Sequence, residues 1–142
     1  MEDKKVKAVD LASIDTVKGA NDGFDVQIYH PGTMIDLGIT INVLGKDSDE
    51  FQKVSRAQNK KRMAKMTKGG FRAQNLTPAP EEVERDGLEL LAKCTRSWSG
   101  VVIDGKDVEF NSANVIMVYE RFPWIKEQVD TAIGDRANFI KG

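Results

Sequence analysis

Two runs of alternating apolar and polar residues constrain the fold of this chain most. The first run covers residues 24–30, and the break Pro31-Gly32-Thr33 separates it from a second run over residues 35–43. The apolar positions of the second run are Ile35, Leu37, Ile39, Ile41 and Val43. Because successive side chains of a strand point to opposite faces, a period of two predicts a β-hairpin with one buried face. Its other face is polar, so we expect an antiparallel sheet that is covered on one side.

A basic helix is predicted directly after the hairpin. Asp47 and Glu50 have the spacing of a capping box, which places the start of the helix near Ser48. The helix is expected to run to about Lys65 and to end before Gly69-Gly70. It contains few apolar residues, so it can bury only a narrow stripe.

The last third of the chain is predicted to be mainly helical. Apolar residues recur at helical spacing from Pro80 to Trp98, which predicts one helix over that segment. Residues 101–110 then form a short hairpin candidate, because Asp-Gly favours a two-residue turn. A cap at residues 111–112 begins another helix, and Pro123 suits the first turn of a further one.

These segments predict an α+β protein with an N-terminal antiparallel hairpin or small sheet, a basic helix, and a mainly helical C-terminal lobe with a short hairpin. We expect residues 1–70 to form the first lobe, with 1–23 loosely ordered, because that segment shows no sustained period. Residues 71–80 contain two prolines and read as a linker. Residues 81–142 would form the second lobe.

Composition excludes several kinds of chemistry. The chain has 142 residues with one cysteine, Cys94, and one histidine, His30. One residue of each type cannot form an internal disulfide framework or a Cys/His zinc site. His30 follows a strand and reads as a turn residue, and Cys94 lies on an apolar helical stripe. We therefore expect no catalytic, metal or cofactor site. The N-terminus lacks a signal peptide and no run is long enough for a membrane span, so a cytoplasmic protein without a membrane partner is expected.

Charge is strongly segregated along the sequence. Residues 1–50 carry 5 basic and 10 acidic side chains, and residues 81–142 carry 8 basic and 12 acidic ones. Residues 51–80 carry 8 basic side chains and no acidic one. The members of this basic block are Lys53, Arg56, Lys60, Lys61, Arg62, Lys65, Lys68 and Arg72. Such a block can be a solvated helix face, a surface for a protein partner, or a nucleic-acid site.

The order of residues after position 83 resembles the tail assembly chaperones of long-tailed bacteriophages. The resemblance is carried by the run from Leu90 to Val101, by Gly105, by the run 111–115, and by Phe122-Pro123-Trp124-Ile125 leading to Ile133 and Asn138-Phe139. It covers roughly residues 83–140 and is weaker over the hairpin and residues 47–51. The basic block has no counterpart in the family pattern.

The resemblance implies a non-enzymatic protein that holds the tape measure protein soluble and helps to recruit tail tube subunits in the host cytoplasm, and that is absent from the mature virion. Such a chaperone needs apolar surface that alternates between self-association and a client helix. The candidate contact residues are Tyr119, Phe122, Trp124 and Val129.

Two other functions stay open from the sequence alone. A phage nucleic-acid-binding protein would use residues 53–72 and would lose affinity steeply with salt. A structural virion component, such as a tail or head-completion protein, would remain in purified particles.

Overall fold

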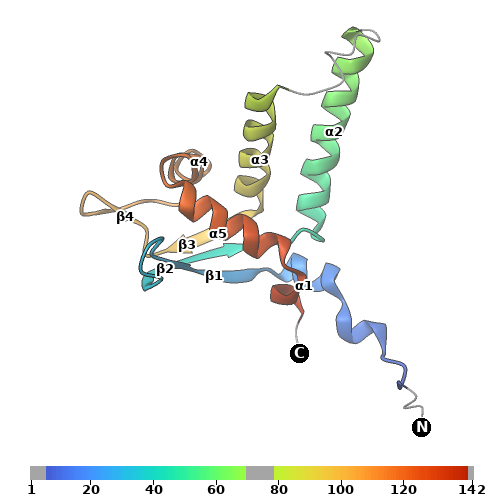
Figure 1. Cartoon of the computed structure of the whole chain (residues 1–142), viewed down its shortest axis with the longest axis horizontal. Helices are drawn as coiled ribbons and strands as arrows, with labels where there is room; N and C mark the ends of the chain where they lie inside the picture. Colours follow the sequence, from blue (N-terminus) through green and yellow to red (C-terminus); the bar gives the residue numbers. More distant parts are fainter. Residues whose placement is uncertain (1–5, 70–78, 141–142) are drawn as a thin grey trace.

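The predicted hairpin is part of a three-stranded antiparallel sheet. A computed structural model describes residues 6–69 and 79–140 (Figure 1). Strand β1 (Phe24–Tyr29) pairs with β2 (Asp36–Val43), which pairs on its other side with β3 (Thr95–Ser99). On one face of the sheet Val26, Ile28 and Ile41 are buried. The predicted α+β class, with an antiparallel sheet, then helices, then a short hairpin, is confirmed.

The distal end of the hairpin is more exposed than the alternation predicts. Ile35 is 64% exposed and Leu37 is 38% exposed, although Ile41 and Val43 are fully buried. The pairing register shifts between Ile28 and the following residue, so two residues of β2 lie outside the ladder at this point. A bulge of this kind bends the strand, so Ile35 and Leu37, which come before Ile39 in the chain, leave the buried face. The expectation of one continuous buried face is therefore wrong at this end.

Four helices and a second hairpin complete the main elements. The helices are α2 (Asp49–Gly69), α3 (Pro80–Cys94), α4 (Ser112–Arg121) and α5 (Pro123–Gly134). Strands β4 (Val102–Ile103) and β5 (Lys106–Asp107) form the short hairpin. Its turn residues Asp104 and Gly105 have φ angles of 53° and 79°, as a two-residue hairpin turn requires. The Asn111 side chain accepts a hydrogen bond from the Asn114 amide at 2.8 Å, which confirms the predicted cap.

Helix α3 ends earlier than predicted. The apolar spacing predicts a helix that extends to Trp98. The helix instead ends at Cys94, and Thr95–Ser99 form strand β3. This segment adds to the open edge of β2, where Trp98 pairs with Ile41. The Trp98 indole also donates a hydrogen bond to the Val108 carbonyl at 3.0 Å. Pairing with a distant strand therefore outweighs the local helical pattern.

The N-terminal segment is better ordered than expected within its described part. A 3₁₀ turn, η1 (Leu11–Ile14), precedes a short helix, α1 (Thr16–Asp22), whose cap Asp15 accepts from the Lys18 amide. Gly19 and Ala20 of α1 are buried against η3 (Arg136–Phe139). The expectation of a loose segment is therefore wrong over residues 11–22, and residues 1–5 lie outside the described residues.

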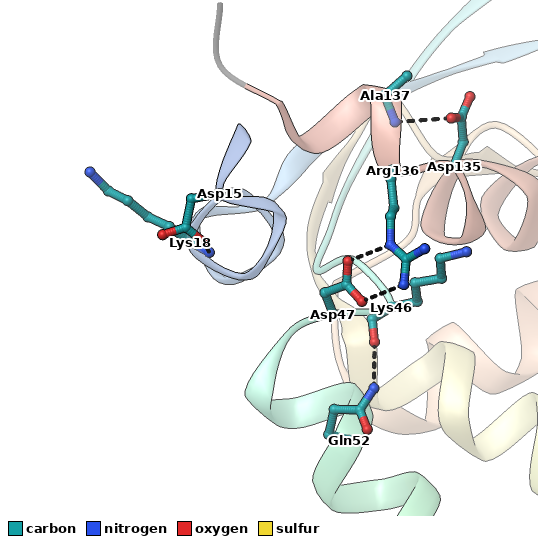
Figure 2. A network of polar contacts seen from close by, with 8 residues as sticks. All are labelled: Asp15, Lys18, Lys46, Asp47, Gln52, Asp135, Arg136 and Ala137. Carbon is teal, nitrogen blue, oxygen red and sulfur yellow. Dashed lines mark hydrogen bonds and ion pairs between the residues drawn. The ribbon is translucent and has the colours of Figure 1, made fainter. Parts of the chain in front are cut away.

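The cap of α2 also differs from the prediction. The Ser48 hydroxyl accepts a hydrogen bond from the Phe51 amide at 3.2 Å, so Ser48 caps the helix. Asp47 instead accepts two hydrogen bonds from the Arg136 guanidinium, at 2.7 and 3.1 Å, as Figure 2 shows. The guanidinium holds the pKa of Asp47 below its ordinary value. Asp47 therefore ties the start of α2 to the C-terminal segment.

One hydrophobic core joins the sheet to the later helices. It includes Val26 and Ile41 from the sheet, Leu91 from α3, Val118 from α4 and Val129 from α5. Helix α5 lies against β1 and β2 and covers the sheet (Figure 1). Most of the expected linker, residues 71–80, lies outside the described residues. The segments before and after it share this sheet and core.

Candidate binding groove

An open groove of about 680 Å³ lies between α3 and the α4–α5 corner. Leu88, Ile116 and Pro123 supply its apolar surface, and the buried Tyr119 lies behind them. Ile116 lines the groove without belonging to the hydrophobic core cluster. The groove therefore offers apolar surface that the fold itself does not require.

Acidic side chains surround this apolar surface. The carboxylates that line the groove are Glu81, Glu84, Glu89 and Glu120, and all four residues are exposed. Two cations, Arg85 and Lys126, also line it, so four negative charges face two positive ones. An apolar floor between charged rims suits an amphipathic helix, whose apolar side enters the groove while its polar flanks meet the rim.

Helix α3 explains how the sequence builds one wall. Glu81, Glu84 and Leu88 recur at intervals of three and four residues, so they follow one side of the helix. Glu82 and Asp86 lie on another side, where they contact α2. One helix thus presents the groove on one flank and packs against α2 on another. The spacing of Glu81, Glu84 and Leu88 was visible in the sequence, although it predicts only a helix side and not the facing wall.

Two of the predicted contact residues are buried. Tyr119 and Val129 have no exposed surface, so the expectation that they lie on an accessible surface is wrong. Both point to the core side of their helices, where the Tyr119 hydroxyl lies 2.7 Å from that of Thr95. Phe122 and Trp124 are half-buried, with ring centroids 6.1 Å apart, and they flank Pro123 at the groove. Of the four predicted contact residues, only the buried Tyr119 is among the residues that line the groove, and Phe122 and Trp124 are the chain neighbours of the lining residue Pro123.

The basic block divides into paired and unpaired parts within the described residues. Arg62 forms an ion pair with Asp86 at 2.8 Å, and Lys65 forms one with Glu82 at 2.8 Å. The exposed members outside these pairs are Lys53, Arg56, Lys60 and Lys61. The side chain of Lys68 and the whole of Arg72 lie outside the described residues. Arg62 and Lys65 thus form ion pairs between α2 and α3, whereas the other described members of the block are exposed to solvent.

The candidate reactive side chains have structural roles. His30 is exposed in the hairpin loop, where its Nδ1 accepts hydrogen bonds from the Gly32 and Thr33 amides, both at 3.0 Å. Cys94 is fully buried, which confirms the predicted core position, and burial raises the pKa of its thiol to about 12. Across residues 6–69 and 79–140, no group of three or more His, Cys, Asp or Glu side chains could hold a metal ion.

No described helix combines the length and the apolar content that a membrane crossing requires. Comparison of the chain with protein-family models, with curated proteins and with solved structures gave no match.

Proposed function

We propose that this protein is a phage tail assembly chaperone that binds helical segments of the tape measure protein and keeps them soluble until tail tube subunits are recruited. The groove beside α3 is the observation that carries the proposal. It combines an apolar floor with an acidic rim, and its lining residues lie between positions 81 and 126. The family resemblance covers almost the same segment, residues 83–140.

The chemistry of the groove suits binding rather than catalysis. Its apolar residues are rimmed by exposed carboxylates and two cations. A client helix would place apolar side chains against Ile116 and Leu88 and basic ones against the rim. Contacts of this kind are individually weak, but several copies along one long client would bind it through avidity. In this proposal the protein performs no reaction of its own.

The test is co-expression in bacteria with the tape measure protein encoded by the same genome. We expect the wild-type chain to keep that client in the supernatant after centrifugation. Ile116→Glu places a charge on the groove floor at a residue outside the core cluster, so the client should return to the pellet. An unchanged client fraction with this variant would contradict the proposal.

A matched control separates the groove from general surface effects. Val102→Glu introduces the same charge at a residue of β4 that is 53% exposed and does not line the groove. Its client recovery should equal that of the wild type. Circular dichroism must show the same helix content in both variants. Equal loss of client with both variants would mean that the groove is not the binding site.

A further inference from the structure

The outward side of α2 carries a row of basic residues. Lys53, Arg56 and Lys60 recur at intervals of three and four, so they lie within about 60° of one another around the helix axis. All three are exposed, and residues 51–80 contain no acidic side chain. The row spans about 10 Å along the helix.

This basic row points away from the rest of its own chain. Arg62 and Gln58, which bind Asp86 of α3, lie roughly on the opposite side of α2 from Lys53 and Lys60. In Figure 1, α2 stands as the outermost helix on one side of α3, whereas α4 lies on the other side. The groove opens between α3 and the α4–α5 corner. The basic row and the acidic groove therefore lie on opposite flanks of one molecule, so the two surfaces cannot contact each other within a single chain.

We propose that the free protein associates with itself head to tail, with the basic row of α2 from one copy seated on the acidic groove of the next copy. Glu81, Glu84 and Glu89 extend about 12 Å along α3, which matches the length of the row. Ala57 lies between Arg56 and Lys60, and Ala64 follows one turn later near the exposed Met63; both alanines are small enough for α2 to approach the groove floor. The interface joins two different surfaces, so it propagates into a ring or a chain of copies.

The whole-chain charge favours a second copy over nucleic acid as the partner. The net charge is −1, because the acidic flanks offset the basic block. A polyanion that extends beyond the basic row would meet chain segments with net charges of −5 (residues 1–50) and −4 (residues 81–142), whereas a second copy offers the groove carboxylates to the row. Self-association also follows from charge complementarity alone, so it does not depend on the identity of the client.

Sedimentation velocity of the purified, nuclease-treated protein tests this proposal. We expect association at low ionic strength that weakens in 1 M salt, where the Debye length is about 3 Å. Lys53→Glu with Lys60→Glu should weaken the self-association constant at least about 10-fold, because like charges then face each other. Glu84→Lys with Glu89→Lys should have the same effect. A wild-type protein that stays monomeric at every salt concentration would overturn the proposal.

Mixing the two reversed variants gives the decisive result. The reversed α2 of one variant complements the reversed groove of the other, so an equimolar mixture should recover association that neither variant shows alone. Lys7→Glu with Lys106→Glu changes the net charge equally at exposed sites elsewhere and should associate like the wild type. Association that resists both reversals, or that disappears once nuclease removes bound nucleic acid, would overturn the proposal. Client recovery in the co-expression assay is a separate readout, so either proposal can fail without the other.

Discussion

Two glycines in helices predict opposite effects of the same substitution. Gly19 lies in α1 and Gly87 in α3. Alanine is favoured over glycine in a helix by about 1 kcal/mol, so helix propensity alone predicts that both substitutions stabilise the protein. A Cβ atom at Gly87 would meet nothing within 4 Å. We therefore expect Gly87→Ala to stabilise the fold by about 0.5 to 1 kcal/mol.

Gly19 has no room for the same methyl group. A Cβ atom there would lie 1.5 Å from the carbonyl oxygen of Phe139, whereas ordinary contact begins at 3.4 Å. The obstacle is backbone, so no side-chain rotation removes it, and α1 and η3 must separate. Overpacking of this size costs about 1 to 3 kcal/mol. Separation would also expose part of Phe139, a side chain of the kind whose full burial contributes about 1.5 to 3 kcal/mol.

Subtracting the gain in helix propensity leaves a net loss of about 2 kcal/mol for Gly19→Ala. For a chain of this size the loss corresponds to a decrease in Tm of about 6 °C, and Gly87→Ala should raise Tm by about 2 °C. Urea unfolding and thermal unfolding, both followed by circular dichroism, measure the two effects. If Gly19→Ala proved as stable as the wild type, the close contact between α1 and η3 would be refuted. A destabilising Gly87→Ala would refute the open environment of α3 at that position.

Buried polar groups and one ion pair support three further predictions. Tyr119→Phe removes one buried hydrogen bond and should lower the free energy of unfolding by about 1 kcal/mol. Thr95→Val leaves the Tyr119 hydroxyl buried without that partner and should lower it by about 2 kcal/mol. Urea unfolding measures both differences. The pKa of Asp47 is lower in the folded state than its ordinary value of 3.8. The carboxylate therefore contributes fully to the free energy of unfolding above pH 3.8, and this contribution is lost as the pH falls through the lower, folded-state pKa. The stability difference between wild type and Asp47→Asn should therefore shrink in acid. Cys94, with its pKa near 12, should react with a thiol reagent only at the rate of unfolding.

Local signals predicted those parts of the fold that depend on neighbouring residues. The Asp104-Gly105 turn and the Asn111 cap are set by backbone geometry within a few positions, and both form as predicted. Strand β3 was missed because its conformation depends on β2, more than 50 residues earlier, where Ile41 pairs with Trp98. A helical period in the sequence does not report the presence of an open strand edge elsewhere in the chain.

The candidate site was predictable only in part for a similar reason. Apolar residues of α4 and α5 were visible in the sequence, but which of them face the core depends on where the sheet lies. Tyr119 and Val129 turn toward it and are buried, whereas Ile116 remains at the groove. Acidic residues near the start of α3 are favoured by the helix dipole, a local effect, and Glu81 and Glu84 also form the groove rim. A groove needs two walls, and sequence spacing describes one wall at a time.

The two proposals together determine how a client would displace a second copy. The outward side of α2 brings mainly charge to the groove, because its three cations accompany only two alanines, Ala57 and Ala64, and one exposed methionine, Met63. Its binding energy is therefore mainly electrostatic and falls with salt. An amphipathic client helix would add apolar burial at about 25 cal/mol per Å² against Ile116 and Leu88, a contribution that salt does not screen. Raising the salt concentration should consequently release copies from one another while leaving client recovery intact, so the same groove would exchange a weak partner for a stronger one without any change in fold.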